Sequence, residues 1–217
     1  MKYLFLIVFG GVFIVAGVLI ATLAAGSARA EAARVEALPS LTAQTLQQQP
    51  EGAEVAVEGL VSSRNPVVFR DFVAYVGEEY RGKRDNRERW VEFERNLPRL
   101  QIETTDGIVQ FANEDYLLTG QLPSWQDSNV LSWNGFTGTG TKRYEGLSVD
   151  DTVTVLGTAK SGSEEVEVQV SKVFYGTRLE YIDDQRFSAQ WLPWFGGIFV
   201  VAGTIVAAFG VVPLIRS

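Results

Sequence analysis

The sequence of 217 residues contains no cysteine and no histidine. Without cysteine, disulfide bonds, thiol catalysis and thiolate metal sites are excluded. Without histidine, the chain lacks the commonest general base and the commonest metal ligand among side chains. No glycine-rich phosphate loop joins a predicted strand to a predicted helix, and no serine has a histidine base. We therefore expect a protein that is not an enzyme and that binds no metal and no cofactor.

Basic residues are fewer than acidic ones, 19 against 26, and every acidic residue lies in the central part of the chain. Nucleic acids are bound by basic surfaces, which neutralise their phosphates. An acidic domain is a poor match for them, so we expect no nucleic-acid partner.

Charge is missing altogether from two long runs, residues 3–25 and 191–215. Each run exceeds the roughly 20 apolar residues that a helix needs to span a bilayer. The sequence therefore predicts transmembrane helices over residues 1–26 and 191–217. The alternative for the first run is a signal peptide cleaved after Ala30, where Ala28 and Ala30 resemble a processing site. Since the run is about twice as long as the usual apolar region of ~7–15 residues, we expect it to be retained.

The charged flanks of the two runs predict an orientation. An even number of spans places both termini on one side, and Lys2 and Arg216 favour the cytoplasm for that side. Arg29 and Arg34 argue weakly for the opposite orientation. The sequence thus predicts an integral protein of the plasma membrane with cytoplasmic termini and an extracytoplasmic domain.

The central part reads mainly as β structure. Residues 27–51 are expected to form a linker, helical at most as far as Pro39, because proline ends a helix. From residue 52, Val55 and Val57 alternate with other residues, as in a half-buried strand. Further alternating segments, and the hairpin signal "TTDG" at 104–107, raise the number to about six to eight strands. We expect a β domain over residues 52–190, built as a small barrel or a sandwich.

Residues 143–159, "RYEGLSVDDTVTVLGTA", are the most regular part of this domain. After a turn at the aspartates, the valines would point into the core and threonines such as Thr154 outward. Gly157 would allow a bulge or a close approach of another backbone. Glu145 would pair with Arg143 or cap the turn, and the alternative for it is a binding role.

This segment and the order of elements around it resemble the GIDE domain, also called the beside-a-membrane domain. That domain occurs in MULAN-type membrane ubiquitin ligases and in prokaryotic relatives, and the likeness covers roughly residues 1–215. The motif positions are Arg143, Glu145, Leu147, Asp151 and Gly157.

The resemblance implies a domain that engages partner proteins beside the membrane, while the chemistry lies elsewhere. In the ligases, a RING binds zinc through cysteine and histidine. This sequence has neither residue, so the resemblance does not imply ubiquitin transfer here.

A cluster of basic residues interrupts the acidic domain at "RGKRDNRERW". Its members are Arg81, Lys83, Arg84, Arg87 and Arg89. One interpretation is a solvated hairpin loop. The other is a contact with anionic lipid headgroups or with an acidic partner, since each basic residue near a membrane surface contributes about 1 kcal/mol.

The predicted spans carry two further patterns. Trp191 and Trp194 fall at a helix end, where indole rings favour the headgroup zone. Small residues recur at Gly17 and Ala21 in the first span and at Gly203 and Ala207 in the second. Such stripes allow helices to approach closely, so we expect the spans to pack antiparallel or to pair with partners.

Three hypotheses for function follow. The first is a non-enzymatic scaffold, anchored in lipid, that binds a protein partner or self-associates. The second is an accessory subunit of a membrane complex or quality-control system, resembling the small β-barrel domains of NfeD-type proteins. The third is an enzyme acting on lipid or glycan, which would need two convergent carboxylates. The candidates for these are Glu78–Glu79, Asp150–Asp151, Glu164–Glu165 and Asp183–Asp184.

Overall fold

The computed structural model describes residues 2–84, 87–127, 138–160 and 166–215. The chain forms two compact units. One contains Leu38–Arg178 and all of the described strands, and the other consists of the two helical ends. The sequence-based boundaries at residues 52 and 190 differ from these, because the segment just before residue 52 belongs to the strand unit and the C-terminal helix begins well before its apolar run. A β domain between two long apolar helices is the architecture that the sequence predicts.

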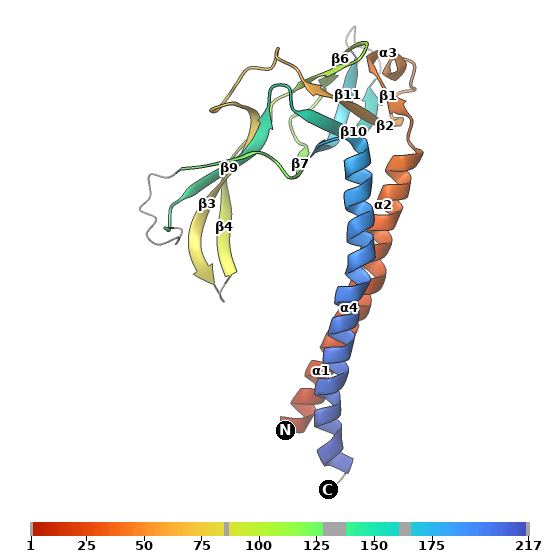
Figure 1. Ribbon diagram of the computed structural model, residues 1–217, viewed down its shortest axis with the longest axis vertical. Helices are drawn as coiled ribbons and strands as arrows, with labels where there is room; N and C mark the ends of the chain where they lie inside the picture. The colour runs from red at the N-terminus through yellow and green to blue at the C-terminus, as the bar shows by residue number, and fades with distance from the viewer. Residues whose placement is uncertain (1, 85–86, 128–137, 161–165, 216–217) are drawn as a thin grey trace. The chain divides into compact units, whose positions relative to one another are not determined.

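The helical unit is an antiparallel hairpin. Its first arm runs through α1 (Lys2–Leu19), a π-helical turn (Ile20–Ala24) and α2 (Ala25–Ala37), and its second arm is α4 (Arg178–Ile215). Both helices are long and apolar enough to cross a membrane. At 1.5 Å per residue, α4 measures about 57 Å, well above the ~30 Å of a hydrocarbon core. Each arm therefore has a polar extension, residues 27–37 and 178–190, which lie side by side (Figure 1).

The π-helical turn keeps one face of the first arm against α4. Gly10 and Gly17 are buried seven residues apart, and so are Ala25 and Ala32, but the step from Gly17 to Ala25 is eight residues. Two turns of α-helix take about seven residues, so the extra residue would rotate the second pair away from the partner. A π-turn absorbs one additional residue. The turn at Ile20–Ala24 thus restores the alignment between the two halves of the arm.

Five strands of the other unit close into a barrel-like ring. They are β2 (Glu54–Val61), β5 (Gln101–Thr104), β6 (Gly107–Phe111), β10 (Thr152–Lys160) and β11 (Glu167–Tyr175). The pairing runs β2–β10–β11–β6–β5 and returns from β5 to β2. Only the β11–β6 pair is parallel within this ring. The sequence predicts a small barrel or a sandwich, and the structure has a small barrel-like sheet.

The interior of the ring is filled by the valines that the alternation indicates. Val55, Val57, Val153 and Val155 are all buried. The expectation for Thr154 is wrong: this residue is fully buried, and its hydroxyl donates to the carbonyl oxygen of Gly176 at 3.0 Å. The strand is covered on both faces there, and the internal hydrogen bond makes burial of a threonine tolerable.

Short elements account for a strand count above the predicted one. The described residues hold eleven strands, among them β1 (Ser40–Leu41), parallel to β2, and β7 (Leu117–Gly120), parallel to β11. β1 and the short helix α3 (Ala43–Leu46) occupy the segment read as a polar linker. Leu41, Ala43 and Leu46 belong to the main core of the domain.

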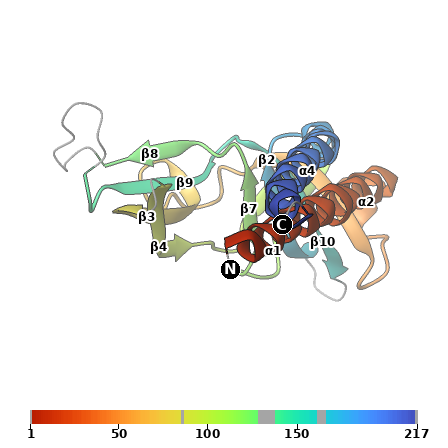
Figure 2. The same cartoon turned by 90° about the horizontal axis from the view of Figure 1, so that it is seen from below.

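A second sheet of four strands is inserted into the barrel connections. Its order is β4 (Arg87–Asn96), β3 (Phe72–Arg84), β9 (Lys142–Ser148) and β8 (Ser124–Gln126), with every pair antiparallel. β3 and β4 lie in the connection from β2 to β5, and β8 and β9 in the connection from β7 to β10. Val73, Ala74 and Leu147 join the barrel core, so the two separate sheets share one core. The strands β3, β4 and β9 lie together in both views (Figures 1 and 2).

Candidate functional site

The five basic residues lie on the outer part of the β3–β4 hairpin. They are Arg81, Lys83 and Arg84 at the end of β3, and Arg87 and Arg89 at the beginning of β4. Strand pairing extends to Arg84–Arg87, so the expected loop is a two-stranded ribbon up to residues 85–86, which lie outside the described part. All five side chains are exposed, and Arg81 forms an ion pair with Glu79 at 2.9 Å. The ribbon thus carries a concentrated positive charge.

Arg143 organises one face of the same sheet. Its guanidinium forms an ion pair with Glu78 on β3, and its Nε lies 3.4 Å from Glu145 Oε1. The guanidinium carbon is 4.4 Å from the centre of the Trp90 ring on β4, a distance at which a cation is attracted to the ring face. The Arg143–Glu145 pair is the one expected from the sequence, whereas Glu78 and Trp90 come from distant positions. Arg143 therefore ties three strands together.

The remaining motif positions stabilise the turn into β10. Leu147 is fully buried in the core. The Asp151 carboxylate accepts a hydrogen bond from the backbone N–H of Ser148 at 2.6 Å, and partial burial raises the pKa of this carboxyl above its usual range. Gly157 lies at a bulge in the β10–β11 pair, where a β-carbon would overlap the carbonyl oxygen of Gln169. These positions have structural roles in the described chain.

An aromatic cluster on the opposite face of the sheet was not found from the sequence. Phe69 stacks on Tyr144 with ring centres 4.3 Å apart, and Tyr75 and Trp125 lie against the same two rings. Burial, followed by a hydrogen bond to Glu94, raises the pKa of Tyr75 to about 12. The members come from β3, β8, β9 and a loop, so spacing along the chain gives no sign of their meeting.

A cleft of about 190 Å³ opens between the Arg143 face and the barrel. Its lining includes the apolar side chains of Val76, Leu97, Leu118 and Leu122 and the charged ones of Glu78, Arg95 and Glu145. Both carboxylates contact Arg143, and Arg95 pairs with Glu92, so the lining carries little unpaired charge.

The paired carboxylates predicted for an enzyme lie on separate elements. Glu78 and Glu79 are neighbours on β3, Asp150 and Asp151 lie in the turn before β10, and Asp183 and Asp184 lie on α4. Glu164 and Glu165 fall outside the described residues. The doublet on β3 is neutralised by Arg143 on one side and by Arg81 on the other.

The predicted small residues lie at the contact between the two arms of the helical hairpin. A β-carbon at Gly17 would lie 2.5 Å from the carbonyl oxygen of Gly196, and one at Gly203 would lie 2.6 Å from that of Gly10. Ala21 lies against Gly196, and Ala207 against Gly10. The backbones approach so closely that the glycines leave no room for a side chain.

Polar side chains link the extensions of the two arms. Tyr181 on α4 is almost fully buried and donates its hydroxyl to Glu31 at 2.6 Å. The same carboxylate is bound by Arg34 at 2.8 Å, and Arg186 pairs with Glu36 at 2.7 Å. The extensions therefore form a two-helix stalk that continues the apolar hairpin.

The boundary between stalk and apolar run is marked by Pro193. Proline has no N–H to donate to the carbonyl of Ala189, four residues earlier. Arg29 of the first arm donates to that oxygen instead, at 3.4 Å. Trp191 and Trp194 lie at the same level with 47% and 70% of their surface exposed, as rings at a headgroup zone would.

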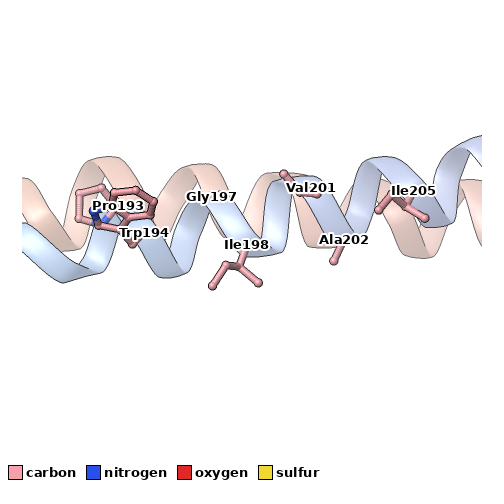
Figure 3. Close-up of a pocket in the computed structure, with 7 residues that line it drawn as sticks. All are labelled: Pro193, Trp194, Gly197, Ile198, Val201, Ala202 and Ile205. Atoms are coloured by element: carbon pink, nitrogen blue, oxygen red, sulfur yellow. The ribbon is translucent and has the colours of Figure 1, made fainter.

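An open apolar groove begins at Pro193 and follows one side of α4 (Figure 3). Its volume is about 650 Å³. It is lined by Pro193, Trp194, Gly197, Ile198, Val201, Ala202 and Ile205. No charged side chain lines the groove, so its surface matches the tails of lipids.

Comparisons with known proteins give little guidance. No family model matches the sequence, and no curated protein matches it. A solved structure of the hypothetical protein ygiW from E. coli is similar over 62% of this chain and 87% of that chain, with 12% identical residues and a TM-score of 0.28.

Proposed function

We propose that this chain is a two-span membrane protein whose β domain serves as a non-enzymatic binding module beside the bilayer. The observation that carries the proposal is the exposed surface of the helical hairpin. Large apolar side chains cover its outer faces, among them Val12, Val15, Trp194, Ile198, Val201 and Phe209. Each would cost about 1.5–3 kcal/mol to leave in water instead of an apolar medium. Lipid removes that cost.

The membrane part of the proposal predicts resistance to alkaline extraction. The full-length protein should stay with washed membranes and be released by detergent. Because the chain has no cysteine, single cysteines can then report its topology. A membrane-impermeant thiol reagent should label Lys83→Cys from outside the cell, and Lys2→Cys only after the membrane is opened. Recovery of a soluble protein trimmed after Ala30 would contradict the anchoring, and the reverse labelling would contradict the orientation.

The resemblance to GIDE domains supports a role in holding partner proteins near the membrane. The motif positions have structural roles, and the carboxylates near Arg143 are neutralised. A surface that binds a partner therefore accounts for the domain better than a reaction does. The second candidate is an accessory subunit of a membrane complex. The five-stranded barrel-like ring favours it, because this alternative resembles the small β-barrel domains of NfeD-type proteins.

The basic ribbon offers a direct test of contact with an anionic surface. Reversing Arg84 and Arg87 to glutamate should weaken binding of the ribbon to anionic headgroups roughly tenfold or more, at about 1 kcal/mol per basic residue. The measurement uses full-length protein in nanodiscs of neutral or anionic phospholipid. Spin-labelled headgroups quench a fluorophore attached at Lys83→Cys.

A charge-matched control is available elsewhere in the domain. Arg64 and Lys160 are exposed and lie outside the ribbon, so their double reversal should leave the quenching unchanged. Weaker quenching at high salt would agree with an electrostatic contact. If R84E/R87E quenches like the parent protein, the ribbon does not bind lipid. Loss of a co-purified protein in this variant would then indicate an acidic partner.

A further inference from the structure

The strand β4 is an edge of the four-stranded sheet. Its only strand neighbour among the described residues is β3 (Figure 1). No residue of β4 is buried. Its outward backbone N–H and C=O groups are available for pairing with another chain, which proteins usually prevent with charges or bulges on such edges.

The charges of β4 do not prevent pairing with a second copy of the same strand, because their order is self-complementary. The strand reads "RERWVEFERN" from Arg87 to Asn96. In an antiparallel pair of two copies centred on Val91, with Phe93 as an extra residue in each strand, Glu88 faces Arg95 of the second copy, and Arg89 faces Glu94. Opposite charges placed directly across two strands stabilise their pairing.

Neighbouring registers bring like charges together. Opposed residues share a face, so the competing registers differ by two positions along the strand. One of them places Glu88 opposite Glu92 of the second copy, and the other places Glu92 opposite itself. Like charges directly across two strands are destabilising, so the sequence of β4 selects one register.

The bulge in β4 puts the complementary charges on matching faces. Side chains seven residues apart point to opposite faces of a regular strand. Here β4 has one extra residue, Phe93, because Glu92 pairs with Glu78 and Glu94 with Gly77. The extra residue shifts the alternation of side chains by one position. Two residues on opposite sides of the bulge, separated by an odd number of positions, therefore lie on the same face.

Contacts within the chain assign these faces. Glu88 accepts a hydrogen bond from Trp90, which lies under Arg143, and Arg95 pairs with Glu92. These side chains lie on the Arg143 face. Glu94 accepts the hydroxyl of Tyr75, so it lies on the aromatic face, and the alternation places Arg89 there too. Directly opposed residues of an antiparallel pair share a face, which both complementary pairs satisfy.

We propose that β4 pairs antiparallel with β4 of a second copy of this chain, through Glu88–Arg95 and Arg89–Glu94 contacts in both directions. The two four-stranded sheets then form one eight-stranded sheet about a two-fold axis, an isologous interface. The inference deepens the proposed binding role, because it names a second copy as the partner. It does not depend on which side of the membrane the domain occupies.

Charge reversal provides a test that distinguishes pairing from misfolding. Glu88→Arg alone places arginine opposite Arg95, and Arg95→Glu alone places glutamate opposite Glu88. Each variant should self-associate roughly tenfold to thirtyfold more weakly than the parent, since two contacts per dimer become repulsive. A mixture of the two variants restores every Glu–Arg contact, so it should associate like the parent protein.

The experiment uses full-length protein in detergent, with each variant carrying one of two affinity tags. Co-purification and sedimentation equilibrium measure association of the parent, of each variant with itself, and of the mixture. A monomeric parent, self-association of both variants at the parental level, or a mixture that fails to associate would each overturn the proposal. Before detergent is added, each variant should still stay with alkali-washed membranes if the membrane proposal holds, so a failure of self-association can be told apart from a failure of membrane anchoring.

Cysteine cross-linking tests the register. Copies with Glu88→Cys should cross-link to copies with Arg95→Cys. Copies with Glu88→Cys alone should not cross-link with each other, because two residues 88 would lie about 20 Å apart, six paired positions at ~3.3 Å each. Cross-linking of Glu88→Cys to itself with none to Arg95→Cys would rule out this register.

Discussion

Replacing Gly196 by leucine is expected to force the two arms of the helical hairpin apart, whereas the same change at Gly197 should leave them together. A β-carbon at Gly196 would overlap the carbonyl oxygen of Gly17 and lie 2.7 Å from the β-carbon of Ala21. A backbone atom cannot move aside as a flexible side chain can. At Gly197, nothing lies within 4 Å of the added carbon. Overpacking of this kind costs about 1–3 kcal/mol and occasionally more.

The variants G196L and G197L control for each other. Both add the same side chain to the same apolar helix at adjacent positions, so hydrophobicity and helix propensity are matched. Phe13 and Phe199 provide the readout, since their ring centres lie 5.6 Å apart across the two arms. With cysteine at both positions, a short thiol cross-linker should join the arms in the parent and in G197L but not in G196L. Equal cross-linking in all three would show that the arms do not meet at Gly196.

A second adjacent pair repeats the test from the other arm. A β-carbon at Gly10 would lie 2.5 Å from the carbonyl oxygen of Gly203, but one at Gly11 meets nothing within 4 Å. The variant G10L should therefore behave like G196L, and G11L like G197L. If G10L and G196L both separate the arms while G11L and G197L do not, the close contact is located on each helix by an independent pair of variants.

The sequence indicates part of the contact between the two arms. The other contacting glycines could not be predicted, because they are not spaced four residues apart. Stripes of small residues four apart point to Gly17 and Ala21, and to Gly203 and Ala207. The glycines that touch lie seven apart in each arm, and Gly10 and Gly196 belong to no stripe of that kind. The stalk was missed for another reason: its residues are charged, and Tyr181 and Glu31 meet only because the helices run side by side beyond the apolar runs.

In the β domain, local periodicity predicts strands and cannot predict their closure. Val55 and Val57, and the hairpin signal at 104–107, identify β2, β5 and β6. β1 and β8 have only two or three residues, too few to show an alternation. The return from β5 to β2 joins residues about 40 positions apart, and no local pattern records it. On β4, Glu88 and Arg95 lie on the same face because of the bulge at Phe93. The sequence does not indicate this bulge, which appears only in the register between β3 and β4.

The seam between β2 and β5 should be a sensitive point of the barrel, and Gly59→Val should open it. Only two residue pairs form this seam, Leu60–Glu103 and Val61–Ile102. A β-carbon at Gly59 would overlap the carbonyl oxygen of Glu103 and lie 2.6 Å from Ile102, which is fully buried. Valine adds two more carbons where neither neighbour has room to retreat.

We expect Gly59→Val to destabilise the domain by about 3 kcal/mol or more, at the upper end of overpacking effects, because closure of the ring is lost as well. Thermal unfolding followed by circular dichroism measures the loss, and hydrogen exchange at Leu60 and Ile102 shows whether the seam opens first. Leu60→Ala is the control, since this neighbouring side chain is 43% exposed and its truncation should cost far less. An unchanged melting temperature in G59V would mean that β2 and β5 do not approach this closely, and the five strands would then form an open sheet.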